Sequence, residues 1–254
     1  MRIKLNYESP NGKIFLPIHY NYYIEQLIYS TLSPILSSKI HNEGYIIDKR
    51  KFKLFTFSRI LEKGLKVKKN NKDLLLFKNG ISFIFSSPLV DVISNFGERS
   101  LKEREFKLFN QKIFINKIEI ITPPRLENNI LIKFLSPVTI HSTVKKIDGK
   151  TRSIYYKPQD KEFSELILKN LKKKYFLIYG ENKELFINIK SIKFSTKLNF
   201  HVILYKDTPI EAYDGIFELS GSKELIILSY DTGLGDRNSE GFGLWEPFKE
   251  NKII

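Results

Sequence analysis

Two stretches near the start of the chain decide the fold: RIKLNY at residues 2–7 and YNYYIEQLIYSTLS at residues 20–33. In the first, Ile3 and Leu5 alternate with polar residues, which predicts a strand with one buried face. In the second, apolar residues recur with the 3.6-residue period of a helix. The predicted inward positions of this helix are Tyr20, Ile24, Leu27, Ile28 and Thr31. A second short helix is expected directly after it, with Ser33 as its cap and Pro34 at its first position.

The segments that follow complete a βαββαβ order, which is typical of a ferredoxin-like domain. The predicted strands are 53–60, 65–69, 74–77, 81–85 and 112–121, and a second helix is predicted at 88–96. The pair Pro123-Pro124 then disfavours both helix and central strand, and marks a linker.

The second half repeats this order with longer insertions. The predicted strands are 130–135, 185–194, 198–205, 210–219 and 242–245, with a hairpin strand at 153–156 after the charged turn 145–150. The predicted helices are 158–174 and 222–230, the second capped by Ser222 and ended by Gly233. We therefore predict an α+β protein with two tandem ferredoxin-like (RRM-like βαββαβ) domains, residues 1–122 and 125–254.

Composition narrows the class of partner. The 254 residues carry a formal net charge of +14 and no cysteine. Without cysteine there are no disulfides or thiolate metal sites, which fits a reducing, cytoplasmic setting. No apolar run approaches the roughly 20 residues of a membrane span, and no motif indicates a metal or a cofactor. The excess of positive charge makes a polyanion the leading partner.

The most specific local pattern is GLGDRNSEGFG at residues 233–243. It is not a Walker loop, because no Gly-Lys-Ser/Thr follows, and Asn238 takes the place of the third glycine of a dinucleotide fingerprint. The glycines permit positive φ and leave the backbone open to a phosphate chain, to which Arg237 would add a charged group. The alternative is a tight helix-to-strand connection that needs glycine for its geometry alone.

Residues 233–243, followed by Leu244, resemble the signature of the CRISPR-associated endoribonucleases that cut repeat RNA into guide RNAs, within the repeat-associated RNA-binding superfamily. Further stretches extend the resemblance along nearly the whole chain. They are Leu16-Pro17, Tyr22-Tyr23, Leu27-Ile28-Tyr29, the segment 53–58, Leu135-Ser136-Pro137, Asn170-Leu171 and Lys174-Tyr175. The resemblance implies tandem ferredoxin-like domains.

The resemblance also implies a catalytic site in the N-terminal domain and a glycine-rich RNA-binding loop in the C-terminal domain. The family's catalytic tyrosine, histidine and lysine map onto Tyr29, His41 and Lys53. The RNA-binding residues expected here are Lys49, Arg50, Lys51, Gly233, Gly235, Arg237, Asn238, Gly241 and Gly243.

These three side chains suit cleavage of RNA without a metal. The 2′-hydroxyl attacks the adjacent phosphorus, so the protein must move two protons and stabilise the negative phosphorane. An imidazole and a phenol can move protons, and an ammonium can supply the positive charge. Which of His41 and Tyr29 is the base stays open.

Helical geometry places Tyr29 about 180° from the predicted inward stripe, facing outward with Tyr22. Each candidate also has a simpler interpretation: an amphipathic surface ring for Tyr29, a solvated loop side chain for His41 and a solvated strand charge for Lys53.

The leading hypothesis is a metal-independent endoribonuclease that cuts CRISPR repeat RNA in precursor transcripts and leaves a 2′,3′-cyclic phosphate and a 5′-hydroxyl. The alternatives are a non-catalytic RNA-binding subunit of the same superfamily and a basic protein that binds other polyanions. Expected partners are repeat RNA and subunits of a CRISPR effector complex, with no membrane and with the protein as a monomer or homodimer.

Overall fold

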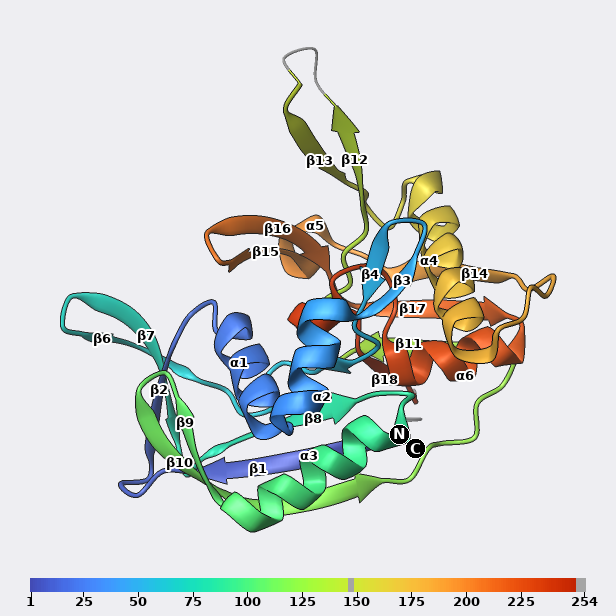
Figure 1. Ribbon diagram of the computed structural model, residues 1–254. Helices are drawn as coiled ribbons and strands as arrows, with labels where there is room; N and C mark the ends of the chain where they lie inside the picture. The colour runs from blue at the N-terminus through green and yellow to red at the C-terminus, as the bar shows by residue number, and fades with distance from the viewer. Residues whose placement is uncertain (146–148, 250–254) are drawn as a thin grey trace, which may run out of the picture. The chain divides into compact units, whose positions relative to one another are not determined.

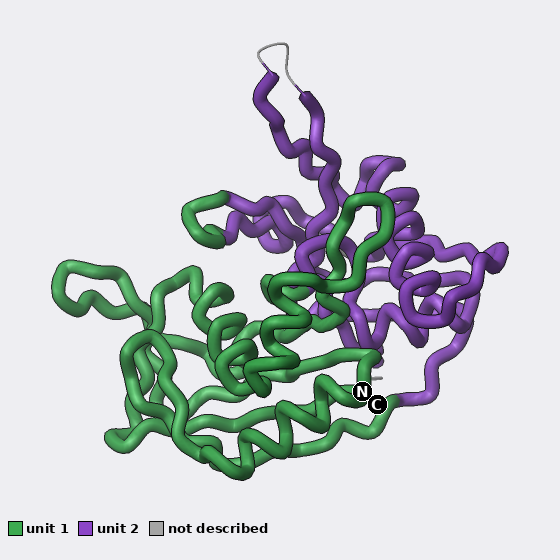
Figure 2. The backbone as a smooth tube through the Cα atoms, in the orientation of Figure 1, with its two compact units in different colours: residues 1–123, 204–208, 239–241 green, residues 124–203, 209–238, 242–254 purple. Residues whose placement is uncertain are grey.

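A computed structural model describes residues 1–145 and 149–249, and the chain divides into two compact units (Figures 1 and 2). Unit 1 comprises residues 1–123, 204–208 and 239–241, and unit 2 comprises residues 124–203, 209–238 and 242–254. Two short segments from late in the sequence therefore belong to unit 1. Every helix in the described part of the chain is too short or too polar to cross a lipid bilayer.

Unit 1 is a ferredoxin-like domain with additions. Its elements are β1 (Arg2–Glu8), β2 (Lys13–Pro17), α1 (Asn21–Thr31), α2 (Pro34–Ser38), the π-helical turn η1 (Lys39–Glu43), β3 (Tyr45–Ile47), β4 (Arg50–Phe52), β5 (Thr56–Phe57), β6 (Leu65–Lys69), β7 (Lys72–Lys78), β8 (Ile81–Ser86), α3 (Val90–Glu103), β9 (Glu105–Leu108) and β10 (Gln111–Ile121). The main sheet has the order β5-β8-β1-β10-β9 with antiparallel neighbours. Without β9, this is the strand order of a βαββαβ unit.

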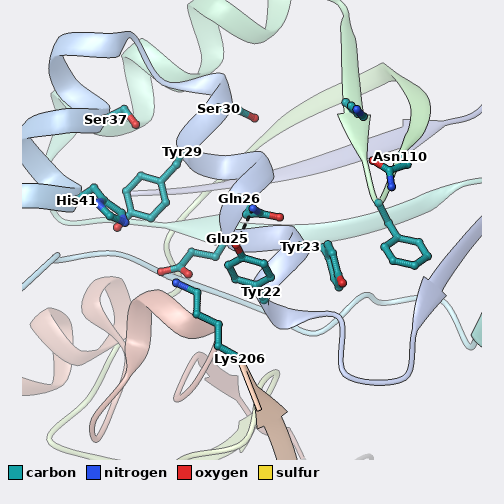
Figure 3. A pocket seen from close by; sticks show the side chains of 12 residues that line it. Tyr22, Tyr23, Glu25, Gln26, Tyr29, Ser30, Ser37, His41, Asn110 and Lys206 are labelled. Atoms are coloured by element: carbon teal, nitrogen blue, oxygen red, sulfur yellow. Dashed lines mark hydrogen bonds between the residues drawn. The ribbon is translucent and has the colours of Figure 1, made fainter. Parts of the chain in front are cut away.

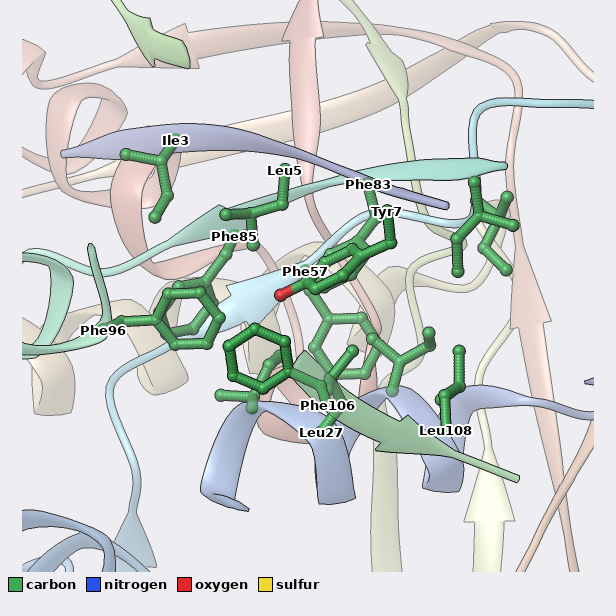
Figure 4. Packing of buried hydrophobic residues seen from close by; sticks show 14 of the residues in the cluster. Ile3, Leu5, Tyr7, Leu27, Phe57, Phe83, Phe85, Phe96, Phe106 and Leu108 are labelled. Carbon is green, nitrogen blue, oxygen red and sulfur yellow. The ribbon is translucent and has the colours of Figure 1, made fainter. Parts of the chain in front are cut away.

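The core of unit 1 lies between this sheet and the helices α1 and α3. Ile3, Leu5 and Tyr7 point from β1 to one face of the sheet and are all buried, as the alternation of the sequence predicts. Phe83 and Phe85 of β8 continue this apolar surface (Figure 4). The α1 positions Ile24, Leu27, Ile28 and Thr31 are buried as predicted, whereas Tyr20 is only partly buried. One face of α1 is thereby fixed against the sheet, and its other face is available for a site.

Unit 2 repeats the same topology. Its elements are β11 (Asn129–Phe134), β12 (His141–Lys145), β13 (Thr151–Tyr155), α4 (Lys161–Tyr179), β14 (Ile187–Lys193), α5 (Thr196–Asn199), β15 (Phe200–Tyr205), β16 (Thr208–Tyr213), β17 (Ile216–Gly221), α6 (Lys223–Thr232), the 3₁₀ turn η2 (Asn238–Glu240) and β18 (Trp245–Pro247). The sheet order β14-β17-β11-β18 is that of unit 1 again, so the predicted tandem ferredoxin-like fold is confirmed. Residues 204–208, which include the turn of the β15–β16 hairpin, belong to unit 1, as does η2 from residue 239 onward.

Two predicted strands are wrong, each for a backbone reason. Within 53–60 only Thr56–Phe57 is a strand, because Leu54 has a φ of +52° and breaks the extended backbone. The segment 210–219 is two strands, β16 and β17, because Gly215 turns the chain with a φ of +119°.

Other boundaries shift, and several elements are new. Helix α3 extends to Glu103, and α4 runs from Lys161 to Tyr179, where Gly180 ends it in the left-handed conformation. The last strand is β18 rather than 242–245. Ser222 stands at the start of α6, but its hydroxyl accepts from the Phe186 amide instead of capping the helix. The strands β2, β3, β4 and β9 were not predicted, and residues 146–148 of the predicted turn 145–150 lie outside the described residues.

Candidate active site

The outer face of α1 forms one wall of a cleft of about 700 Å³ in unit 1, called the α1 cleft below (Figure 3). Its lining residues are Tyr22, Tyr23, Glu25, Gln26, Tyr29, Ser30, Ser37, His41, Lys107, Phe109, Asn110 and Lys206. Tyr22 and Tyr29 both line it, as their position opposite the buried stripe of α1 predicts. Glu25 and Tyr29 are four residues apart, and this spacing stacks them on one side of the helix.

His41 reaches the α1 cleft from the π-helical turn η1, which directly follows α2. The short helix α2 begins at Pro34, and Ser33 caps it by accepting from the Leu36 amide, as predicted. Gly44 ends η1 with a φ of +62°, and its amide donates to the Lys39 carbonyl five residues earlier. π-Helical turns are rare and occur frequently at functional sites. The sequence predicts only a polar turn here.

The imidazole of His41 is exposed and its tautomer is set by a neighbour. Its Nδ1 lies 2.9 Å from Oδ1 of Asn42, whose own amide nitrogen donates to the Ser38 hydroxyl. Because an amide oxygen only accepts, Nδ1 carries the proton in this arrangement. Nε2 is then the nitrogen that can take a proton from a ligand.

Lys53 approaches the same place from the chain between β4 and β5. Its Nζ lies 5.2 Å from the centroid of the Tyr29 ring and 3.8 Å from Oε1 of Glu25. The positive φ of the neighbouring Leu54 is unusual for a bulky buried residue, and backbone outliers of this kind cluster at functional sites. The three residues Tyr29, His41 and Lys53, which the sequence pointed to, therefore come together in one unit.

Tyr29 is the centre of this group. Its ring packs edge-on against the His41 ring, at 5.1 Å between centroids, and against Phe55 at 5.6 Å. Its hydroxyl is buried and has no hydrogen-bond partner among the described residues. Burial, followed by the negative charges of Glu25 and Glu240, raises the pKa of this phenol well above its ordinary value. Tyr29 is consequently protonated at neutral pH and is a donor rather than a base.

Glu25 is a functional candidate that the sequence analysis missed. It is only 4% exposed, accepts a hydrogen bond from the Tyr205 hydroxyl and pairs with Lys53. Burial raises the pKa of its carboxyl, with Glu240 adding to the effect, while Tyr205, Lys53 and Lys206 oppose it. The sequence does contain an indication of this role, because Glu25 is the one charged residue of α1.

A buried carboxylate needs a reason, because taking a charge out of water is costly unless it is paired. The pairing here fixes the Lys53 ammonium between the Glu25 carboxylate and the Tyr29 ring. The group around Tyr29 thus combines a proton acceptor, a proton donor and a held cation. Among the described residues, no group of three or more His, Cys, Asp or Glu side chains is arranged to hold a metal ion.

The predicted RNA-binding residues Lys49, Arg50 and Lys51 lie on the β3–β4 hairpin and are exposed. Lys49 forms the turn with a φ of +64°. The ammonium of Lys51 donates to the Asn42 carbonyl and so links the hairpin to η1. Lys49 and Arg50 extend from the hairpin that directly precedes Lys53.

The glycine segment 233–243 is tightly packed. A Cβ on Gly235 would overlap the Thr139 carbonyl, and one on Gly243 would overlap the Leu234 carbonyl. The side chain of Asn238 is used internally: its nitrogen donates to the carbonyls of Leu234 and Phe242, and its oxygen accepts from Lys174. Close approach of backbone therefore accounts for these glycines.

Gly241, Gly233 and Arg237 belong to the same segment and have different neighbours. Gly241 belongs to unit 1, where its carbonyl accepts from Asn21 of α1 and a Cβ would overlap the Phe57 ring. Gly233 ends α6 with a φ of +75°, as predicted, and its carbonyl accepts from Lys174. Arg237 is partly exposed with a φ of +54°. Binding of RNA by this segment stays a prediction.

The buried ammonium of Lys174 holds the segment together. Its Nζ donates to the Gly233 carbonyl at 2.9 Å and to Oδ1 of Asn238 at 2.7 Å. Burial lowers the pKa of Lys174 to about 7, an effect that the Asp236 carboxylate opposes. Apart from its place in the family resemblance, the sequence shows Lys174 only as one more basic residue of a helix.

The chain matches two protein-family models: "CRISPR-associated protein Cas6, N-terminal" over residues 15–119, and "CRISPR associated protein Cas6, C-terminal" over residues 119–247. It is 28% identical to a CRISPR-associated endoribonuclease Cas6 1 of Methanocaldococcus jannaschii, over 96% of this chain and 91% of that one. A CRISPR-associated endoribonuclease Cas6 of Pyrococcus furiosus is 25% identical, over 95% and 87%. A solved structure described as "CRISPR associated protein Cas6" is 26% identical with a TM-score of 0.78, covering 98% of this chain and 99% of its own.

Proposed function

Because the chain belongs to the CRISPR-associated Cas6 family, we propose that it is an endoribonuclease that cuts CRISPR repeat RNA in precursor transcripts to give guide RNAs. The observation that carries this proposal is that His41 and Lys53 both lie against the ring of Tyr29, which lines the α1 cleft. The names of the relatives from M. jannaschii and P. furiosus support the same activity.

The proposed reaction begins with the 2′-hydroxyl of the nucleotide before the cut. Nε2 of His41 takes its proton while the 2′-oxygen attacks phosphorus, and the bond from phosphorus to the 5′-oxygen breaks. The Tyr29 hydroxyl gives its proton to that departing oxygen, and the Lys53 ammonium stabilises the negative charge on the phosphorane. The products are a 2′,3′-cyclic phosphate and a 5′-hydroxyl.

Two features support giving the acid role to Tyr29. Its phenol has a raised pKa and is protonated at neutral pH, so it begins the reaction with a proton to donate. Nε2 of His41 is the acceptor in the tautomer that Asn42 sets. His41 then returns its proton to Tyr29, which restores both groups. Since these three side chains supply both proton transfers and the positive charge, the proposed reaction needs no metal.

Phosphate binding is proposed for the exposed cations of the β3–β4 hairpin and for Arg237. Lys49 and Arg50 leave the hairpin just before Lys53 and are free to meet phosphates on the RNA. The net charge of +14 favours a polyanion and makes binding strongly salt-dependent. In this proposal the glycines of 233–243 shape the loop that carries Arg237.

The test uses end-labelled repeat RNA from a CRISPR array of the host, incubated with the protein in EDTA. We expect one cut in the repeat, with a cyclic phosphate on the upstream fragment. His41→Ala should remove most cleavage and leave RNA affinity nearly unchanged, whereas His19→Ala, a matched histidine ahead of α1, should cleave normally. Binding without cutting by the unaltered protein would overturn the proposal in favour of an RNA-binding subunit. Cleavage by His41→Ala at the normal rate would remove His41 from the site.

A further inference from the structure

The turn between β9 and β10 places a bulky ring where small or polar residues are usual. Phe109 and Asn110 have φ values of +45° and +60° and connect the paired residues Leu108 and Gln111. Two-residue turns of this geometry favour Asn, Asp and Gly. Other two-residue turns with such φ values are Asp48-Lys49 at β3–β4, Asn70-Asn71 at β6–β7 and Lys206-Asp207 at β15–β16, and none of them holds an aromatic residue. A phenylalanine in this conformation is sterically disfavoured, and its ring is partly buried against the core of unit 1.

The ring of Phe109 lines two clefts of unit 1. It forms part of the α1 cleft, where it packs edge-on against Tyr23 at 4.9 Å between centroids. In Figure 3, Tyr23 and Asn110 lie toward one end of this cleft and His41 toward the other. Phe109 also lines a second cleft of about 260 Å³. Phe109 therefore lines both the α1 cleft, where we propose that the RNA is cut, and this second cleft.

The second cleft combines aromatic and basic groups. Its lining residues are Phe15, Lys69, Asn70, Lys72, Leu74, Phe109 and Gln111. The ammonium of Lys69 lies 3.9 Å from the centroid of the Phe15 ring, and Lys72 is exposed across the turn of the hairpin. None of these described lining residues is acidic. The cleft is consequently suited to a ligand that is both planar and negatively charged.

The α1 cleft continues this pattern toward His41. Lys206 stands over the Tyr22 ring at 4.9 Å, and the exposed Lys107 lies on β9 beside the Phe109 turn. Both clefts are thus lined by rings together with ammonium groups. Proteins that hold single-stranded nucleic acid use this combination, with bases stacked on rings and phosphates on cations. Duplex RNA is recognised instead by shape and by contacts to phosphates and 2′-hydroxyls.

We propose that Phe109 is the stacking platform for one unpaired base of the RNA strand that leaves the α1 cleft, and that Lys69 and Lys72 hold the phosphates beyond it. This inference rests on the proposed function for the identity of the RNA. Stacking explains why a strained phenylalanine stands at a position where an asparagine would turn the chain with less strain. In this proposal the β6–β7 hairpin, which carries Lys69 and Lys72, binds the substrate RNA.

The test measures binding of repeat RNA made uncleavable by a 2′-deoxy nucleotide at the scissile position. Phe109→Leu removes the stacking face and retains apolar bulk, Phe109→Tyr retains the face, and Phe114→Leu on β10 is the matched control. We expect Phe109→Leu to weaken binding about 5- to 50-fold, and the other two to bind as the unaltered protein does. Thermal melting of each variant shows that it is folded.

A set of RNAs with one abasic nucleotide each, stepped along the strand near the cut, locates the base. At one position the abasic RNA should bind the unaltered protein and Phe109→Leu equally, because the stacking partner is already missing. If the difference between the two proteins persists with every abasic RNA, or is absent with the intact RNA, the proposal is overturned.

The lysines give a second measurement that does not depend on the turn. Lys69→Met with Lys72→Met should lower the slope of log affinity against log salt by about 1.4, the value for two single-strand phosphate contacts. An unchanged slope contradicts the phosphate assignment. Because the RNA is uncleavable, these results are independent of catalysis: a protein that shows the abasic effect but cuts no natural repeat refutes the proposed function alone.

Discussion

Replacing Glu25 by glutamine tests whether the buried carboxylate acts by holding Lys53. The substitution keeps the shape of the side chain and an oxygen that accepts from the Tyr205 hydroxyl, but removes the negative charge 3.8 Å from the Lys53 ammonium. At an effective dielectric constant of about 20, two unit charges at this separation attract by about 4 kcal/mol. Desolvation of both groups offsets much of this, so about 1.5–3 kcal/mol remains to position the cation.

If that free energy serves the transition state, single-turnover cleavage of labelled repeat RNA should slow about 10- to 100-fold. Folding should be affected little, because a buried charge disappears together with its desolvation cost. Glu98→Gln, on the exposed side of α3, changes the net charge equally and is the matched control. It should cleave at the normal rate, and both variants should melt near the unaltered protein.

A double-mutant cycle with Lys53→Met tests whether Glu25 acts by positioning the Lys53 ammonium or in another way. If Glu25 acts through Lys53, Glu25→Gln should cause no further loss once the ammonium is gone. A rate for Glu25→Gln equal to that of the unaltered protein would refute the reasoning. The reasoning would also be refuted if Glu25→Gln reduced the cleavage rate by the same factor in the unaltered protein and in Lys53→Met. Glu25 would then act on a group other than Lys53.

Three further predictions concern stability. Tyr29→Phe removes a buried hydroxyl that has no partner in the described chain, so the free energy of unfolding in urea should rise by about 1 kcal/mol while cleavage falls; a clear destabilisation would show that the hydroxyl is bonded. The pKa of Lys174 is lowered from 10.5 to about 7, so between these values the unfolded chain binds a proton that the folded one has released, and stability should rise with pH. In urea titrations from pH 7 to about pH 9, Lys174→Met should lose this rise, and an equal rise in both proteins would contradict the assignment. Gly243→Ala should cost more than about 3 kcal/mol, because a Cβ overlaps the Leu234 carbonyl at positive φ, whereas Gly180→Ala, in open space, should cost about 1 kcal/mol; equal costs would show that the segment relaxes.

Regular patterning made most of the fold predictable. Alternation gave β1, and the 3.6-residue period gave the buried face of α1, because each feature is local and repeats. The pair Ser33-Pro34 identified the start of α2 for the same reason. The predictions fail where one residue takes a conformation that no period signals. Leu54 breaks a segment that is rich in strand-forming residues, and η1 is a single π-helical turn.

The site was predictable mainly through the family resemblance. Lys53 is one of 42 basic residues, and nothing in its local pattern separates it from the others. Tyr29 was found independently, since helical geometry places it opposite the buried stripe. The pairing of Glu25 with Tyr205 joins residues 180 positions apart and cannot be read from either segment. Glu25 is the one charged residue of α1. This pattern indicates a role for Glu25 only once its partners Lys53 and Tyr205 are known.

The most direct test of the proposed chemistry replaces the departing 5′-oxygen of the scissile phosphodiester by sulfur. A sulfur leaving group needs no proton, so a defect in the general acid disappears with this RNA, whereas a defect in the base remains. Under single-turnover conditions we predict that the sulfur RNA restores Tyr29→Phe to within a few-fold of the unaltered protein and leaves His41→Ala slow. Tyr29→Phe remaining equally slow on both RNAs, or rescue of His41→Ala in its place, would contradict the assignment of donor and acceptor at this site.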